Sequence, residues 1–173
     1  MNKRTIDTLL LAGIAALTLA FSWQLSGTLH DHVVVEGEAA PDFSIRADSG
    51  HTLTNTSFDG KVLILNFWAT WCPPCITEMP SLDQLQRQYA SRGLVVLGVS
   101  WDQDEALYKK FLARNHVNFQ TAREPDRSIG NLYGTIKIPE SYIIDRNGKV
   151  LRKIVGAANW TDPQLTSYVE SLL

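Results

Sequence analysis

Cysteine is scarce in this sequence: the chain of 173 residues has two, Cys72 and Cys75, spaced C-x-x-C. A disulfide-stabilised scaffold is therefore excluded, because small folds of that kind depend on several bridges. The motif supplies only half of the ligands of a structural zinc ion, and none of the 4 histidines forms a recognisable pair with a further cysteine. Covalent haem attachment requires a histidine directly after the second cysteine, where this chain has Ile76. A purely stabilising disulfide is disfavoured, since the entropic gain from a cross-link grows with the length of the loop that it closes.

An excess of charge of either sign is also lacking. The chain has 16 basic and 18 acidic residues and a formal net charge of -2, which provides no basic surface for nucleic acid. Internal repeats and low-complexity segments are absent, and the length suits one domain. Apolar residues make up 45% of the chain, so a packed core is available to hold the fold.

Charged residues are missing from residues 8–29, a segment rich in leucine and alanine. This segment is long enough to span a bilayer as a helix. A cleaved signal peptide is the alternative, but no clear small-x-small site ends the segment, and its apolar core is long for such a peptide. A buried core helix would explain neither the basic residues before the segment nor its missing polar face.

The charges on either side of this segment predict its orientation. Lys3 and Arg4 precede it and acidic residues follow it, so the positive-inside rule places the N-terminus in the cytoplasm and the rest of the chain outside. We therefore predict a cytoplasmic stub at 1–7, a transmembrane signal-anchor at 8–29, a linker at 30–38 and a single domain at 39–173.

The pattern of apolar residues in that domain predicts a mixed sheet with helices on both faces. We expect a long helix that follows Cys75 and ends near Gly93, with Pro80 kinking or splitting it. The other expected elements are a hairpin around Asp48–Gly50, strands at 62–67, 94–99 and 117–121, helices at 102–115 and 128–133, a hairpin across Asn147–Gly148 and a last helix from Asp162.

The two cysteines stand where the apolar strand from Val62 meets this long helix. Cys72 is thereby placed at the N-terminus of the helix, where unpaired N–H groups and the positive end of the dipole favour the thiolate. Cys75, one turn further on, is close enough to form a disulfide with Cys72. The spacing therefore predicts a redox-active pair.

The string from Asn66 to Pro80, with Trp-Cys-Pro-Pro-Cys at its centre, resembles the TlpA/ResA-like branch of the thioredoxin family, which is related to CcmG and DsbE. Supporting matches lie at 37–43, 59–61 and 138–145, so the likeness covers residues 37–173. It implies a thioredoxin-like α/β fold, with a mixed central sheet, helices on both faces, an N-terminal β-hairpin and a helix–strand insertion.

The same resemblance implies a membrane-anchored thiol–disulfide oxidoreductase outside the cytoplasm, typically linked to cytochrome c maturation. No metal and no cofactor beyond the disulfide itself are expected. The expected partners are protein disulfides, apocytochrome c among them, and an integral-membrane dithiol that donates electrons.

The resemblance makes Cys72 the attacking thiol and Cys75 the resolving one. Pro139 matches the family's cis-proline, which packs beside the disulfide, and the backbone at Ile138 would offer an edge to an extended substrate. Trp71 is expected to contact the substrate beside Cys72.

Glu78 is the candidate for the proton transfer that accompanies exchange. Glu78 lies three residues past Cys75, hence on the same helix face, and could accept the proton of Cys75. The ordinary alternative is a solvated surface glutamate. Glu140, directly after Pro139, is expected in the same neighbourhood, as a residue that contacts the substrate. Ordinary thioredoxins have a buried aspartate where this chain has Asn66, which cannot act as a base and makes another carboxylate more necessary.

The doubled proline between the cysteines predicts the redox direction. A sulfur at the N-cap accepts from the N–H groups two and three residues on, and Pro74 has none, so Cys75 is left as the one donor. A less stabilised thiolate favours the disulfide, and the couple should therefore be a reductant.

Two other functions remain open from the sequence. A peroxidase on this fold would have a threonine three residues before its attacking cysteine, where this chain has Ala69. A copper chaperone would need a third ligand beside the cysteines, and no histidine stands in an obvious place.

Overall fold

The computed structural model describes residues 3–28 and 33–173, with the side chains of the first range described from 11 to 23. The chain divides into two units between His32 and Val33. The first contains helix α1 (Lys3–Thr28), whose large apolar side chains between Leu11 and Trp23 are exposed. Within the described residues, no helix has the length and apolar character that crossing a membrane requires. Residue 29 of the predicted anchor and residues 30–32 of the predicted linker lie outside the described residues, and the anchor stays a prediction.

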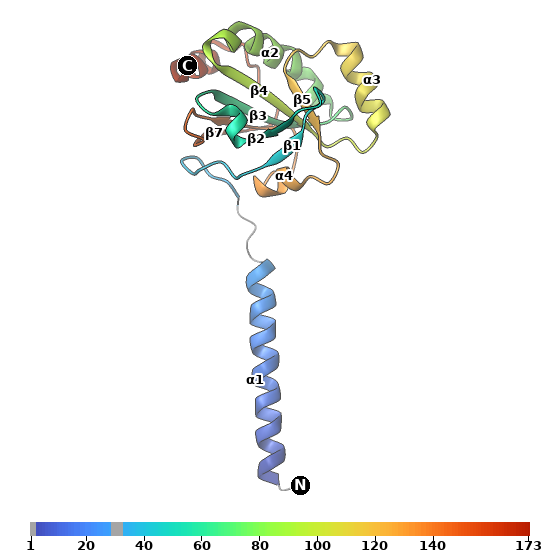
Figure 1. Cartoon of the computed structure of the whole chain (residues 1–173), viewed down its shortest axis with the longest axis vertical. Coiled ribbons are helices and arrows are strands. Elements are labelled where there is room, and N and C mark those ends of the chain that lie inside the picture. Colours follow the sequence, from blue (N-terminus) through green and yellow to red (C-terminus); the bar gives the residue numbers. More distant parts are fainter. Residues whose placement is uncertain (1–2, 29–32) are drawn as a thin grey trace. The chain divides into compact units, whose positions relative to one another are not determined.

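The second unit is built on a five-stranded sheet in the order β5-β4-β3-β6-β7 (Figure 1). Strand β3 (Val62–Trp68) lies at its centre, parallel to β4 (Leu94–Ser100), which in turn is parallel to β5 (Gln120–Arg123). On the other side β6 (Glu140–Ile144) runs antiparallel to β3 and pairs with β7 (Val150–Val155). The predicted mixed sheet is confirmed.

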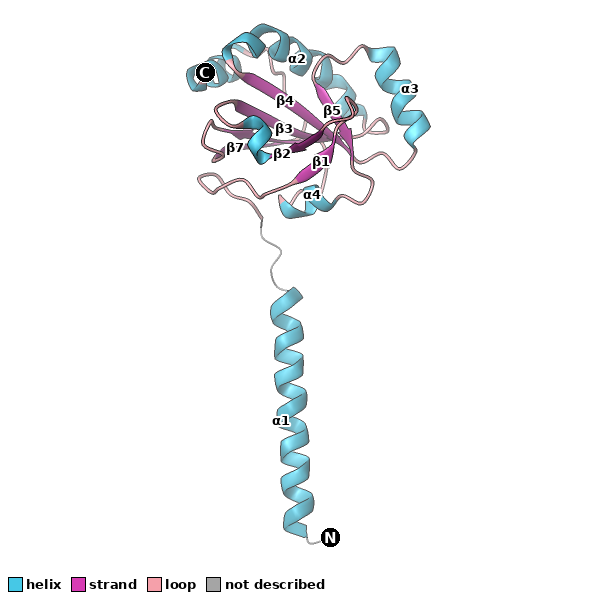
Figure 2. Ribbon diagram, in the orientation of Figure 1, coloured by secondary structure: helices cyan, strands magenta, loops and turns pink. Residues whose placement is uncertain are grey.

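Further elements cover both faces of this sheet (Figure 2). Helices α2 (Pro73–Tyr89), α3 (Glu105–Asn115) and α5 (Pro163–Leu172) contribute buried side chains to one core cluster. The opposite cluster contains side chains of α4 (Ser128–Leu132) and of the antiparallel ribbon β1 (Ser44–Arg46) and β2 (Thr52–Thr54). Two 3-10 turns, η1 (Asn55–Phe58) and η2 (Ala90–Arg92), complete the second unit.

Strand β3 separates the two clusters because successive side chains of a strand point to opposite faces. Its even-numbered apolar residues, such as Ile64, belong to the cluster beneath α2, and its odd-numbered ones, such as Leu65, belong to the other. Asn66, with even parity, therefore faces the α2 side. This parity decides below which polar side chains can reach the cysteines.

Three details differ from the sequence-based expectations. Helix α3 begins at Glu105 and not at residue 102, because Asp104 serves as its N-cap residue. Helix α2 continues through Pro80 as one element, so the predicted split does not occur, while the predicted stop is confirmed by Gly93 at φ 98°. Strand β5 begins later than predicted, at Gln120, because the preceding segment turns to α2: the Asn118 N–H donates to Asp83 Oδ1 at 2.7 Å.

Candidate active site

Cys72 and Cys75 form a disulfide at the N-terminus of α2. Cys72 is the N-cap residue, and its sulfur accepts from the backbone N–H of Cys75 at 3.3 Å. Pro73 and Pro74 occupy the first two helical positions and have no N–H to offer. The structure thus has the single-donor arrangement that the sequence predicts.

Restoring the second donor should change the chemistry of Cys72. Pro74→Ala supplies an N–H at the position from which an N-cap atom ordinarily accepts. A hydrogen bond to a charged group contributes about 1.5–3 kcal/mol, so the pKa of the Cys72 thiol should fall by about one unit or more. The reduction potential should rise with it, because a stabilised thiolate favours the reduced form. Thiolate absorbance during a pH titration of the reduced protein measures the shift.

Pro73→Ala is the matched control for this substitution. It also removes a proline, but the N–H that it restores lies directly next to the N-cap, where it does not serve the cap atom. Equal shifts of the pKa in the two variants would contradict the single-donor explanation.

The segment before β6 approaches the disulfide from the side. The peptide bond Ile138–Pro139 is cis, as the resemblance implies. The Ile138 carbonyl oxygen lies 3.8 Å from the Cys72 sulfur. Pro139 is buried, whereas Trp71, next to Cys72, has 57% of its surface exposed. The structure therefore brings the predicted substrate-contacting backbone together with Cys72 and leaves an indole at the surface beside them.

Glu78 is buried in the core beneath α2, with 3% of its surface exposed, so it is not a solvated surface glutamate. Its Oε1 accepts from Asn66 Nδ2 at 2.8 Å, and its Oε2 accepts from the Ala158 N–H at 3.0 Å. Burial raises the pKa of this carboxyl, and the hydrogen bonds from Ala158 and Asn66 oppose that rise. A buried carboxyl with a raised pKa, one helical turn from Cys75, has the properties of a group that takes up a proton.

Asn66 connects this glutamate to the sheet. Its Nδ2 also donates to the Ser141 hydroxyl at 2.9 Å, and the two residues face each other across the β3–β6 pairing. From the sequence, Asn66 is notable only because it replaces the buried aspartate of ordinary thioredoxins. In the structure its amide group is a donor that holds the Glu78 carboxylate.

Asn66→Asp should therefore make the stability of the protein more sensitive to pH than that of the wild type. It replaces the donor by a second buried carboxyl beside Glu78, and two such groups cannot both ionise at low cost. We expect the melting temperature to fall by about 10 °C at pH 8 and to be close to that of the wild type at pH 5. Asn118→Asp is the control, because the Asn118 side chain donates to the buried Asp83 at 3.1 Å but is itself exposed to solvent. A similar pH dependence in the control would contradict the role of burial.

Glu140 does not lie with the dithiol, contrary to the expected shared neighbourhood. Its carboxylate accepts from Thr135 Oγ1 at 2.9 Å and pairs with Lys153 Nζ at 2.7 Å. In β6, Glu140 is paired with Phe67, whose side chain belongs to the cluster on the face opposite α2. One residue along a strand reverses the face, so adjacency to Pro139 in the sequence placed this carboxylate on the wrong side of the sheet.

The site residues predicted from the sequence did not include Asp102, which the structure places beside the segment that leads to Cys72. Its carboxylate accepts from the backbone N–H and from the hydroxyl of Thr70. A signal was available, since Asp102 follows the buried strand Leu94–Ser100 closely and the carboxyl ends of adjacent parallel strands meet at one edge of a sheet. The Ala158 N–H, which holds Glu78 from the loop after β7, has no comparable signal.

Comparison with known proteins gives consistent matches. Residues 36–153 match the model of the AhpC/TSA family. The chain is 32% identical to the thiol-disulfide oxidoreductase ResA of Bacillus thuringiensis subsp. konkukian over 169 residues, which cover 98% of this chain and 94% of that protein. A ResA protein of Geobacillus thermodenitrificans is 31% identical over 98% of this chain and 94% of its own length.

Solved structures agree with these relatives. A structure assigned to the thiol:disulfide interchange protein DsbE of Chlorobium tepidum superposes with a TM-score of 0.71 at 34% identity, covering 80% of this chain and 95% of that one. A second thiol:disulfide interchange protein of the thioredoxin family, from Chlorobium tepidum TLS, gives a TM-score of 0.69 at 30% identity, covering 81% and 99%.

Proposed function

The chain belongs to the AhpC/TSA family and is a thiol-disulfide oxidoreductase similar to the ResA proteins, and from this premise we propose that it reduces protein disulfides outside the cytoplasm through Cys72 and Cys75. The observation that carries this proposal is the disulfide at the start of α2, with one backbone donor on the N-cap sulfur and the Ile138 carbonyl beside it.

In the proposed reaction the reduced protein supplies two electrons. The Cys72 thiolate attacks one sulfur of the client disulfide, forms a mixed disulfide and releases the first client thiolate. Cys75 then loses its proton and attacks the Cys72 sulfur. This step forms the Cys72–Cys75 disulfide of the present structure and releases the second client thiolate. Glu78 is the proposed acceptor of the Cys75 proton, because it lies one turn away on the same helix and is buried with a raised pKa.

An extended client segment is the proposed substrate, lying along the backbone at Ile138 with Trp71 at its side. Apocytochrome c is the proposed client, and an integral-membrane dithiol is the proposed electron donor. Support for both comes from the likeness of residues 37–173 to the TlpA/ResA-like branch.

Attachment to a membrane through residues 8–29 belongs to the same proposal. Its support is the uncharged, leucine-rich sequence of that segment and the basic residues before it. Membrane fractions of cells that express the full chain should retain it after washing at alkaline pH. Protease added to spheroplasts should digest the domain, and a protected domain would contradict the proposed location.

The reduction potential of the full-length protein tests the redox direction. Equilibration with dithiothreitol or glutathione buffers should give a value near that of thioredoxin, about -270 mV, or somewhat higher. A potential close to that of the strongly oxidising periplasmic enzymes, about -120 mV, would make the protein a disulfide donor instead. Without any reversible two-electron couple, titration with copper would be the next measurement.

Reduction of peroxide is the competing reaction within the same family. Ala69 is fully buried where such an enzyme would have its threonine, so no hydroxyl supports a peroxide there. Peroxide consumption by the reduced protein should therefore stay near the rate of an ordinary thiol. Rapid turnover of peroxide would overturn the proposal.

A further inference from the structure

Asp102 is a buried carboxylate that the proposed exchange reaction does not use. It lies just after β4, with 3% of its surface exposed. Its Oδ2 accepts from the Thr70 N–H at 2.9 Å and from the Ser100 hydroxyl at 2.6 Å, while its Oδ1 accepts from the Thr70 hydroxyl at 2.6 Å. All three donors are neutral. A buried carboxylate is costly unless it accepts hydrogen bonds, and these three bonds offset that cost.

Thr70 belongs to the turn that delivers Cys72 to the helix. The N–H of Cys72 donates to the Ala69 carbonyl at 3.2 Å, which closes a turn with Thr70 and Trp71 at its centre. Thr70 is the first central residue of this turn. Asp102 accepts from both of its hydrogen-bond donors, the N–H and the hydroxyl. The conformation of this turn sets the direction of Trp71 and the position of the N-cap sulfur.

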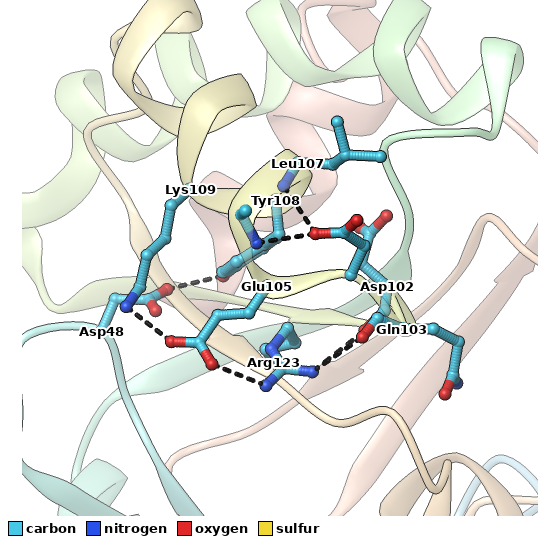
Figure 3. A network of polar contacts seen from close by, with 10 residues as sticks. Asp48, Asp102, Gln103, Glu105, Leu107, Tyr108, Lys109 and Arg123 are labelled. Carbon is cyan, nitrogen blue, oxygen red and sulfur yellow. Dashed lines mark hydrogen bonds and ion pairs between the residues drawn. The ribbon is translucent and has the colours of Figure 1, made fainter.

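The segment that carries Asp102 is itself held from β5 (Figure 3). Arg123 donates to the carbonyl oxygens of Asp102 and Gln103 at 3.4 and 3.5 Å. The same guanidinium pairs with Glu105 at 3.2 Å, in the first turn of α3. Asp102 thus bonds Thr70 from a backbone segment that Arg123 contacts on its other side, and we call this arrangement of Arg123, Asp102 and Thr70 the clamp.

We propose that Asp102 is a positioning residue for disulfide exchange: by holding Thr70 it fixes the turn Ala69–Cys72, so that the Cys72 sulfur and Trp71 meet a client segment docked along Ile138. This inference rests on the proposed function of the dithiol. It predicts a selective defect, because a docked peptide disulfide depends on the position of the sulfur, whereas a small disulfide can approach a displaced thiolate freely.

The test compares two oxidants of the reduced full-length protein, a small aromatic disulfide and a peptide with an internal disulfide. Asp102→Asn places an amide N–H₂ against groups that already donate, which breaks the clamp at constant size. We expect the rate constant with the peptide to fall about tenfold or more and that with the small disulfide to change by less than about twofold. Thr70→Val removes only the hydroxyl and should show the same selective loss, and Thr70→Ser should restore most of the rate.

Asp104→Asn is the matched control. It makes the same change of charge two residues away, at an exposed position where the carboxylate caps α3 through the N–H groups of Ala106 and Leu107. It should leave the ratio of the two rate constants unchanged. Melting temperatures are measured for each variant, because mere loss of folded protein would lower both rates alike.

The outcomes separate the inference from the function on which it rests. A wild-type protein that reacts with neither disulfide would overturn the proposed function. A wild type that reduces both, with Asp102→Asn and Thr70→Val lowering both rates equally or neither, would overturn the positioning role and leave the function standing.

Discussion

Cys75→Ser is expected to convert the protein from a reductant that turns over into one that traps its client. Cys72 keeps its place at the N-cap and can still attack a disulfide, but no second thiol remains to open the mixed disulfide. A covalent complex with the client should therefore accumulate, resolved by non-reducing electrophoresis and released by dithiothreitol. Turnover should fall to the background rate.

Cys72→Ser is the matched variant for this experiment. Cys75 has 1% of its surface exposed, against 5% for Cys72, and it donates its N–H to the N-cap sulfur without being the cap itself. A thiol in that place is both shielded and poorly activated, so Cys72→Ser should lose turnover and form no trapped complex. A trapped complex with Cys72→Ser but not with Cys75→Ser would reverse the assigned roles of the two cysteines.

The sequence was sufficient for the parts of the site that depend on local chemistry. The strand that ends at the motif, the N-cap position of Cys72 and the missing donor at Pro74 follow from residues close to one another in the chain. Glu78 could be placed on the face of Cys75 because helical spacing fixes that relation. Its burial could not be predicted, since it depends on Ala158 and Asn66, which approach from other elements.

Residues brought together by the sheet were harder to predict. Glu140 comes two residues after Ile138, whose carbonyl oxygen lies 3.8 Å from the Cys72 sulfur, yet strand alternation turns the Glu140 carboxylate to the opposite face. Asp102 is distant from Thr70 in the sequence, and only the parallel pairing of β3 and β4 brings the two to one edge. Predictions from adjacency in the chain fail where a sheet decides which face a side chain takes.

Glu78→Gln is expected to slow exchange by about 100-fold or more at neutral pH, the usual size of a general-base contribution. The amide keeps the shape of the carboxyl but cannot accept the proton of Cys75. In the wild type the rate should rise with pH through the pKa of Glu78, which burial holds above the ordinary value of 4.5. The defect should shrink at alkaline pH, where Cys75 loses its proton without help. Single-turnover reduction of a peptide disulfide across pH measures both effects.

Glu140→Gln is the control, because it changes an equally buried carboxyl on the other face of the sheet. An equal slowing in this variant would mean that loss of any buried acid disturbs the site, and the assignment of Glu78 would fail. A defect in Glu78→Gln that persists undiminished at high pH would also contradict a role in proton transfer.

The raised pKa of Glu78 also affects the stability of the protein. Rising pH increases the exchange rate through this group, but it lowers the stability that the group contributes. A carboxyl that binds its proton more tightly in the folded state contributes stability below its unfolded pKa, and this contribution is lost as pH rises through the folded value. The melting temperature of the wild type relative to that of Glu78→Gln should therefore fall from acidic to neutral pH, since the amide does not titrate. Glu78 would thus oppose folding most in the pH range where, as a carboxylate, it can accept a proton. Such an opposition is expected of a group that is kept buried for its chemistry rather than for the fold.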